Sequence, residues 1–233
     1  MRRFRHLTGQ HRTSASNWRL GLLTEVSLKV LPVAPAEATL RFESNQADAL
    51  RKLHGWGGQP LPLNASCWVQ DGGVGTLYVR LRGAVAAVQA ACKTMGGTLL
   101  DNATTAPDWS ACRDHTLPWF AQRAQQPDLA LWRLSLPATA PVLPLPAAAQ
   151  PLVEWHGALR WVQAPASAGD ALRAAAEAVG GSASVFVAAS ADPESASGQF
   201  DPKSAALAQI HARVKQAFDP AGIFNPGRLA AAW

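Results

Sequence analysis

The sequence predicts an α+β fold in which a ferredoxin-like antiparallel sheet carries helices on one face. The elements expected between residues 38 and 100 follow the order strand, helix, strand, strand, helix, strand. Asp71-Gly72-Gly73 has the composition of a hairpin turn between two of these strands. Strand, hairpin and helix then recur between residues 129 and 188, which indicates one extended sheet rather than a second domain.

The first group of elements is marked by caps and turns. Asn45 is a plausible N-cap, and glycines at 55, 57 and 58 end the helix that it begins. An Ala- and Val-rich helix closes at Gly96-Gly97. The expected strands are 38–42, 65–70, 76–81 and 98–100, and the expected helices are 45–54 and 84–95.

The second group is less regular. For residues 108–124 the sequence leaves two structures possible, a helix or an irregular segment, because Pro118 interrupts the stretch. The Ala/Pro-rich stretch 137–151 is typical of a connection with polyproline II tendency. The other expected elements are a strand at 129–136, a hairpin of 152–156 and 158–163 around Gly157, a helix at 168–179 stopped by Gly180-Gly181, and a strand at 184–188.

Both ends of the ordered region carry a further element. Residues 26–30 alternate in polarity and predict a half-buried strand that ends at Pro32. After a loop at 189–199 that we expect to be mobile, a last helix spans 202–218. Its apolar side chains form one stripe, made of Leu207, Ile210, Val214 and Phe218.

The charge distribution argues against nucleic acid as a partner. The chain has a formal net charge of +5, but five arginines precede the first acidic residue, Glu25. The remaining 16 basic residues balance 16 acidic ones, so no basic face is expected for a phosphate backbone.

Several other function classes find no support in the sequence. Pro, Gly or a charge breaks every apolar run before it could span a membrane. Cys67, Cys92 and Cys112 form no CxxC pair, and we expect three buried or idle thiols in a reducing compartment. The histidines lack metal-ligand spacing, so we expect no metal, and no Walker loop, G-x-S-x-G or GxGxxG motif occurs.

The first 19 residues form an Arg-, Ser- and His-rich tail without apolar periodicity. Three interpretations stay open: a disordered tail, an organellar transit peptide, and an aberrant segment produced by an altered start or reading frame.

Two short motifs carry a family resemblance. The first is Gly21-Leu-Leu-Thr-Glu-Val-Ser-Leu-Lys, and the second is Asp219-Pro-Ala-Gly-Ile-Phe-Asn-Pro-Gly-Arg. In this order and at this separation they resemble the segments with which FAD-linked oxidases of the vanillyl-alcohol-oxidase type close the FAD-binding domain and return to it. Between them, Leu131 to Pro137, Gly157 to Trp161 and Gly180-Gly181 resemble the glycolate oxidase FAD-binding subunits of that family.

The resemblance implies FAD as cofactor and oxidation of a 2-hydroxy acid, glycolate to glyoxylate, through the flavin. It also implies which residues contact the cofactor: Gly21, Thr24, Glu25, Asn225 and Gly227. Glycines allow close approach of the backbone to a flavin, and an Asn side chain offers both a donor and an acceptor to a ring edge. The same residues also suit an ordinary strand start and an ordinary turn.

Two arginines are candidate substrate ligands. Arg133 and Arg160 fall inside expected strands, where a guanidinium needs a counter-charge or an acceptor. Either one could bind the carboxylate of a 2-hydroxy acid, or could lie at an edge of the sheet facing solvent. The catalytic residue is not identified.

The resemblance divides the chain into four parts. They are the tail at 1–19, the last strand of the FAD-binding domain at 20–33, the cap or substrate domain at 34–199, and a C-terminal segment at 200–233 that returns to the FAD-binding domain. Most of that domain is expected to be missing, so we expect the isolated chain to be inactive as an oxidoreductase.

Three functions remain in view. The first is an FAD-binding subunit of a glycolate oxidase, cytoplasmic and held at the inner membrane face through partner subunits. The second is a noncatalytic assembly module that docks on a flavoprotein and an iron–sulfur subunit. The third is a free-standing ferredoxin-like ligand-binding domain.

Overall fold

The computed structural model describes Leu20, Val30 and residues 32–71, 73–146, 149–191 and 205–225. The chain divides into two units, Pro32–Ala196, and Met1–Leu31 together with Ser197–Trp233. The expected tail at 1–19, the strand at 26–30 and most of the loop at 189–199 lie outside the described residues. The assignment of segments to a flavin-binding domain and a cap stays a prediction.

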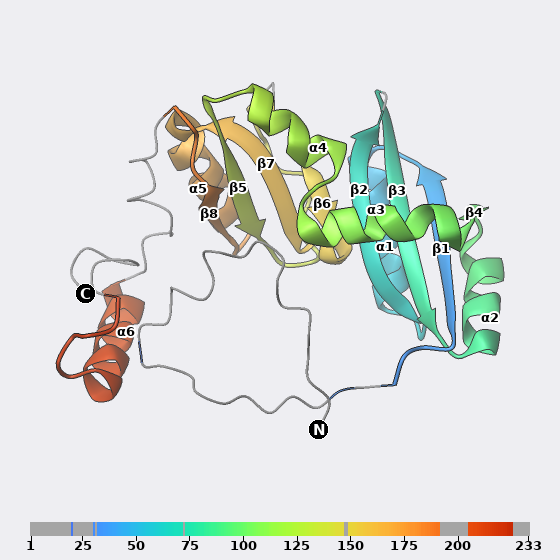
Figure 1. Cartoon of the computed structure of the whole chain (residues 1–233), viewed down its shortest axis with the longest axis horizontal. Helices are drawn as coiled ribbons and strands as arrows, with labels where there is room; N and C mark the ends of the chain where they lie inside the picture. Colours follow the sequence, from blue (N-terminus) through green and yellow to red (C-terminus); the bar gives the residue numbers. More distant parts are fainter. Residues whose placement is uncertain are drawn as a thin grey trace. The chain divides into compact units, whose positions relative to one another are not determined.

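The unit Pro32–Ala196 is built on one eight-stranded antiparallel sheet (Figure 1). Its strand order is β4-β1-β3-β2-β6-β7-β5-β8. The strands are β1 (Ala36–Glu43), β2 (Leu63–Asp71), β3 (Val74–Gly83), β4 (Thr98–Leu100), β5 (Leu129–Ser135), β6 (Leu152–Glu154), β7 (Leu159–Pro165) and β8 (Ser182–Val187). The predicted α+β class with an antiparallel sheet is confirmed.

The first half of the sheet has the ferredoxin-like order β4-β1-β3-β2. Helix α1 (Gln46–Gly57) begins at the predicted N-cap, because the Asn45 side chain accepts a hydrogen bond from the Asp48 amide at 2.9 Å. Helix α2 (Val85–Met95) ends at Gly96, which has a φ of 68°. Strand β3 lies between β1 and β2 and pairs with both in an antiparallel manner.

The second half repeats this order in reverse across the sheet, as β6-β7-β5-β8. Helix α5 (Gly169–Glu177) follows the β6–β7 hairpin as α2 follows the β2–β3 hairpin. Between β5 and β6, however, the described residues of 136–151 form neither helix nor strand, as their prolines predict. The two halves meet at β2 and β6, which pair only at Cys67–Glu154 and Trp68–Val153.

Alternating residues along the strands point to opposite faces of the sheet and pack in different hydrophobic cores. On one face, α1 and α2 cover the first half and α5 covers the second. On the other face lie α3 (Asn102–Asp114) and α4 (Pro118–Ala121), whose aromatic side chains pack with Cys67, Leu131 and Trp161. The structure therefore adds a second helical layer to the single layer expected from the sequence.

Helix α3 resolves the segment that the sequence left open. It begins six residues before residue 108, at a cap formed by Asp101, whose carboxylate accepts a hydrogen bond from the Thr104 amide at 3.0 Å. The cap compensates part of the cost of Pro107 inside the helix. Pro118 does not interrupt a helix but begins α4, where its missing N–H costs nothing.

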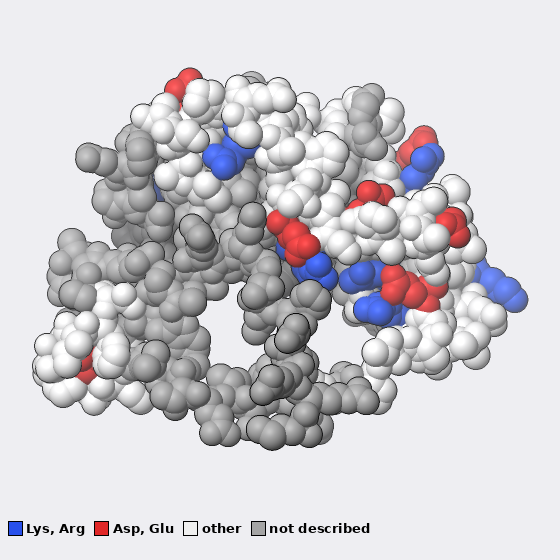
Figure 2. Space-filling view, viewed as in Figure 1, with Lys and Arg blue, Asp and Glu red and all other residues white. Residues whose placement is uncertain are grey.

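Charged side chains of both signs are interspersed on the face drawn in Figure 2. Three arginines pair with acidic neighbours at 2.8 to 2.9 Å: Arg41 with Glu43, Arg82 with Glu37, and Arg113 with Asp114. In the part of the chain that the structure describes, no helix has the length and apolar character needed to cross a bilayer.

Candidate functional site

The described part of the second sequence motif, Asp219 to Asn225, forms a closed turn after helix α6 (Ala205–Phe218). The Asp219 carboxylate accepts hydrogen bonds from the Ile223 amide at 3.0 Å and the Phe224 amide at 2.9 Å. Lys215 forms an ion pair with Asp219 and donates to the Phe224 carbonyl at 2.8 Å. One buried carboxylate thus fixes both the helix end and the turn.

Electrostatic interactions keep the Asp219 carboxyl group of this turn ionised. The Lys215 ammonium group, together with the two backbone amides, lowers the pKa of the Asp219 carboxyl group to about 2. Asn225 follows the turn with a φ of 43°, in the left-handed region that Asn tolerates better than most residues. The motif therefore sets the backbone at Asn225, whose side chain is one of the predicted flavin contacts.

The other predicted flavin contacts cannot be placed. Gly21, Thr24, Glu25 and Gly227 lie outside the described residues. Whether they come close to Asn225 stays a prediction.

The two candidate substrate arginines lie on opposite faces of the sheet. Arg160 is 1% exposed and lies on the face covered by α5, where it donates to the Ala140 carbonyl at 2.7 Å and the Pro141 carbonyl at 2.6 Å. Burial lowers the pKa of its guanidinium to about 10. The observed partners of Arg160 are thus backbone carbonyls of the Pro-rich connection.

Arg133 is half-buried on β5, directly across from Trp161 on β7. By the period of two along the strand it lies on the same face as Leu131, which packs in the α3–α4 core. Of the two arginines, only Arg133 lies on that face.

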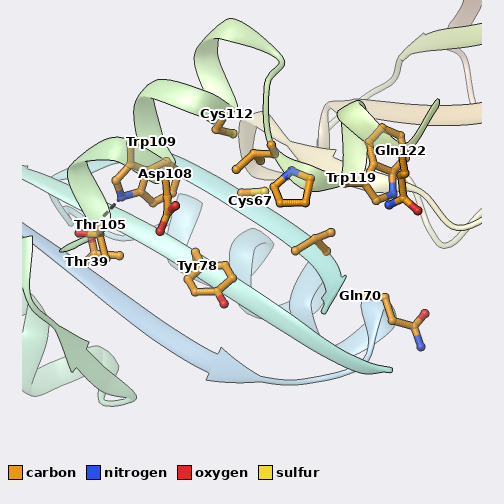
Figure 3. Close-up of a pocket in the computed structure, with 13 residues that line it drawn as sticks. Thr39, Cys67, Gln70, Tyr78, Thr105, Asp108, Trp109, Cys112, Trp119 and Gln122 are labelled. Carbon is orange, nitrogen blue, oxygen red and sulfur yellow. Dashed lines mark hydrogen bonds between the residues drawn. The ribbon is translucent and has the colours of Figure 1, made fainter. Parts of the chain in front are cut away.

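A cavity of about 400 Å³ opens on the α3–α4 face of the sheet (Figure 3). Strands β1, β2 and β3 form one wall and α3, α4 and the residues around them form the other. The lining residues are Thr39, Cys67, Val69, Gln70, Tyr78, Thr105, Asp108, Trp109, Cys112, Leu117, Pro118, Trp119 and Gln122. This set combines three large aromatic side chains with hydroxyl, amide, thiol and carboxyl groups.

One end of the cavity is fixed by a buried hydroxyl group. Trp109 on α3 donates its indole N–H to the Thr39 hydroxyl on β1 at 2.9 Å, and the Thr105 hydroxyl lies 3.4 Å from the same atom. The Arg80 guanidinium covers the Trp109 ring at 5.0 Å from its centroid and donates from Nε to Asn64 at 2.8 Å. These contacts hold the indole of Trp109 in place as a rigid wall.

Two thiols and a carboxylate meet beneath the other wall. The Cys112 thiol donates to Glu154 Oε1 at 2.7 Å, and the Trp161 indole donates to Glu154 Oε2 at 2.5 Å. Glu154 is buried, and burial raises the pKa of its carboxyl group above the ordinary range although both hydrogen bonds lower it. Cys67 lies on the neighbouring strand as the register partner of Glu154.

The environment of Cys112 keeps its sulfur protonated. A hydrogen bond with the Cys67 thiol is the largest cause that raises the Cys112 pKa, followed by burial and the charge of Glu154. The sequence predicts buried thiols here, and Cys67 and Cys112 are indeed buried. It offers no local signal for their contact, since residues 67, 112 and 154 are far apart in the chain.

The cavity does not suit the diphosphate of FAD. None of its lining residues is Lys or Arg, and the carboxyl group of Asp108 contributes negative charge. Among the described residues, no group of three or more His, Cys, Asp or Glu side chains could hold a metal ion. Of the predicted flavin contacts, the one that the structure describes is Asn225, in its fixed turn, and its contact with a flavin stays a prediction.

Comparisons with known proteins give two matches. Residues 200–229 match the model of the C-terminal domain of FAD-linked oxidases. The chain is also 37% identical, over 212 residues, to the glycolate oxidase subunit GlcE of Escherichia coli (strain K12). That alignment covers 91% of this chain and 54% of the relative, so the chain spans about half the length of the relative it matches.

The family match covers α6 and the Asp219–Asn225 turn, where the sequence carries the second motif. The resemblance predicted from the sequence is thus confirmed: residues 200–229 are similar to the C-terminal domain of FAD-linked oxidases, and 91% of the chain is similar to a glycolate oxidase subunit.

Proposed function

We propose that this chain is part of an FAD-linked glycolate oxidase subunit and contributes a substrate cap and a flavin-contacting tail. The observation that carries the proposal is the 37% identity over 212 residues to a glycolate oxidase subunit. In this proposal residues 34–199 form the cap, and 20–33 with 200–233 belong to the FAD-binding domain. The subunit works in the cytoplasm and reaches the inner membrane face through its partners.

The proposed flavin contacts are Gly21, Thr24, Glu25, Asn225 and Gly227. Support comes from the turn that Asp219 and Lys215 hold, because a rigid turn fixes the backbone that carries Asn225 and so lowers the entropy cost of ordering this segment on binding. Bound FAD supplies the acceptor for the two electrons of the 2-hydroxy acid. The role of the chain itself is to orient the flavin and the substrate.

The proposed substrate ligand is Arg133. A guanidinium pairs with a carboxylate in a bidentate manner, which suits the anionic group of glycolate. Its position on the α3–α4 face, half-buried beside Trp161, supports this role. Arg160 is the weaker candidate, because Nη1 and Nη2 already donate to carbonyl groups.

The function is tested by glycolate-dependent reduction of an artificial dye, with the full chain assembled with the other subunits of the oxidase. We expect activity with the chain and none without it. Arg133→Met should lower kcat/KM for glycolate at least tenfold while the melting temperature stays unchanged. Equal activity with and without the chain would remove the proposed function.

The flavin contact needs its own measurement. After incubation with excess FAD and desalting, the assembled protein should keep its absorption near 450 nm, and Asn225→Ala should retain less. Asn102→Ala in the cap is the matched control and should retain as much as the unmodified protein. Equal retention by both variants would eliminate the Asn225 contact.

A second candidate function is an assembly module that docks on a flavoprotein and an iron–sulfur subunit. The exposure of the predicted apolar stripe on α6 favours it: Ile210 is 55% exposed and Phe218 is 67% exposed. Ile210→Glu should abolish co-elution with those purified subunits in size-exclusion chromatography, whereas Leu99→Glu on β4 should not. Co-elution of the Ile210→Glu variant would argue against this docking face.

A further inference from the structure

Cys67 and Cys112 approach each other from two separate elements. Cys67 lies on β2 and is 5% exposed, and Cys112 lies on α3 and is 6% exposed. Both line the same cavity, and both are free thiols (Figure 3). Glu154 brings them together, because it is the register partner of Cys67 and the hydrogen-bond acceptor of Cys112 at 2.7 Å.

The third cysteine provides an internal contrast. Cys92 lies on α2 and packs against the core on the opposite face of the sheet. It is separated from the other two by the sheet itself, so it has no route to either sulfur in the folded protein. Any pairing in the native state therefore selects one pair of the three.

We propose that Cys67 and Cys112 form a redox-active dithiol, which a small neutral hydroperoxide entering the cavity converts into a disulfide between β2 and α3. A neutral oxidant suits this cavity, because its lining includes the Asp108 carboxyl group and no Lys or Arg that would attract an anion. The two thiols are close enough to form a side-chain hydrogen bond with each other, and both line the cavity that the oxidant would enter.

The reaction proceeds in two balanced steps. Glu154 takes the proton of Cys112, and the resulting thiolate attacks one peroxide oxygen. An S–O bond forms, the O–O bond breaks, and the leaving alkoxide or hydroxide takes the proton back from Glu154. Cys67 sulfur then attacks the sulfenic acid of Cys112, an S–S bond forms, and the S–O bond breaks to release water with the Cys67 proton. Two thiols lose two electrons, and the hydroperoxide gains them as an alcohol and water.

We expect the oxidation of Cys112 to be slow because of the environment of its thiol. Its raised pKa leaves Cys112 mainly as the thiol, which is a poor nucleophile. The disulfide would also remove the hydrogen bond between Cys112 and Glu154 and would tie α3 to β2 along one wall of the cavity. Oxidation is therefore expected to alter the cavity while the sheet stays intact.

The test is thiol counting and non-reducing peptide mapping of the full chain after treatment with hydrogen peroxide. We expect the count to fall from three free thiols to one, with a disulfide joining the peptides of Cys67 and Cys112 and full recovery on reduction with dithiothreitol. Cys92→Ser should lose two thiols at the unmodified rate, and Cys67→Ser should form no intrachain disulfide.

Three results would overturn the inference: a disulfide that includes Cys92, oxidation of Cys112 that dithiothreitol does not reverse, or three intact thiols under conditions that fully oxidise glutathione. The peptide map of the unmodified protein decides among them, so the outcome does not depend on whether a variant folds. A higher melting temperature of the oxidised protein, lost on reduction, is expected as a second readout.

Discussion

The two halves of the sheet share one strand order but differ in what covers them. In the first half, α1 connects β1 to β2 and buries Leu50 and Leu53. In the second half, the Pro-rich connection from β5 to β6 takes the same place in the chain order, and it buries Ala140 and Leu143. A helix and a non-helical segment thus fill equivalent positions.

The difference lies in how each segment satisfies its backbone. A helix pairs its own carbonyl groups, whereas an extended segment needs donors from elsewhere. In the second half Arg160, a residue that is 1% exposed, donates to the Ala140 and Pro141 carbonyl groups. In the second half a buried arginine thus donates to backbone carbonyl groups, whereas in the first half the backbone N–H groups of a helix do so.

The largest expected effect comes from removing that donor. Arg160→Met leaves the buried Ala140 carbonyl group and the partly buried Pro141 carbonyl group without their donors, and it should lower the free energy of unfolding by about 3 kcal/mol. Urea denaturation measures the loss. Arg133→Met on β5 is the matched control, with an expected change below about 1 kcal/mol. Similar losses in the two variants would refute the anchoring role of Arg160.

The next effect tests the equivalence of the halves at their edge strands. Gly97 and Gly181 directly precede β4 and β8. A Cβ atom on Gly97 would lie 2.9 Å from the Arg41 carbonyl oxygen, and one on Gly181 would lie 2.6 Å from the Ser135 carbonyl oxygen. Substitution of either by Ala should cost about 2 to 3 kcal/mol, by the same denaturation assay.

The neighbouring glycines sharpen this comparison. Gly96 and Gly180 both have positive φ, at 68° and 76°, but a Cβ atom there meets nothing within 4 Å. Their replacement by Ala should cost only about 1 kcal/mol, from backbone strain alone. Equal losses at Gly96 and Gly97 would mean that close packing does not distinguish the two positions.

A smaller effect concerns the seam between the halves. Burial raises the pKa of the Glu154 carboxyl group, so the folded state holds its proton at a pH where the unfolded state has lost it. Stability should therefore fall as pH rises from about 4.5 through the raised pKa. Cys67, Cys112 and Trp161 surround this carboxyl group from three elements.

Glu154→Gln carries no ionisable group at this position, so its stability should fall less steeply over that window than that of the unmodified protein. Denaturation midpoints between pH 4.5 and 7 measure it. Glu43→Gln, at an exposed position, should keep the slope of the unmodified protein. An unchanged slope in Glu154→Gln would show that another group causes the pH dependence.

The smallest effect belongs to the first half alone. Asn45→Ala removes the N-cap of α1 and should cost about 1 kcal/mol. Thermal unfolding monitored by circular dichroism is sufficient to detect it. The described residues of the connection in the second half form no helix, so they offer no cap to remove. A loss as large as that of Arg160→Met would contradict the division of roles between the halves.

Local signals in the sequence were enough for most elements. Caps and turns depend only on neighbouring residues, and the structure confirms those that the sequence predicted. They are the N-cap at Asn45, the hairpin between β2 and β3, and the glycine pairs at 96–97 and 180–181. Helix α3 was missed at its start because Pro107 masks the cap at Asp101. Trp155 and His156 end β6 early, with φ values of 49° and 54° that no composition rule predicts for these residue types.

The sequence by itself determined the α+β class, the order of the strands and of helices α1, α2, α5 and α6, and the resemblance to FAD-linked oxidases, since each depends on periodicity, turns or short motifs. Only the tertiary structure decided which face each helix covers, that Arg160 serves backbone carbonyls, and that Cys67, Cys112 and Glu154 meet. The physical reason is that burial and hydrogen bonding join residues distant in the chain, and no local pattern records which distant residues become neighbours.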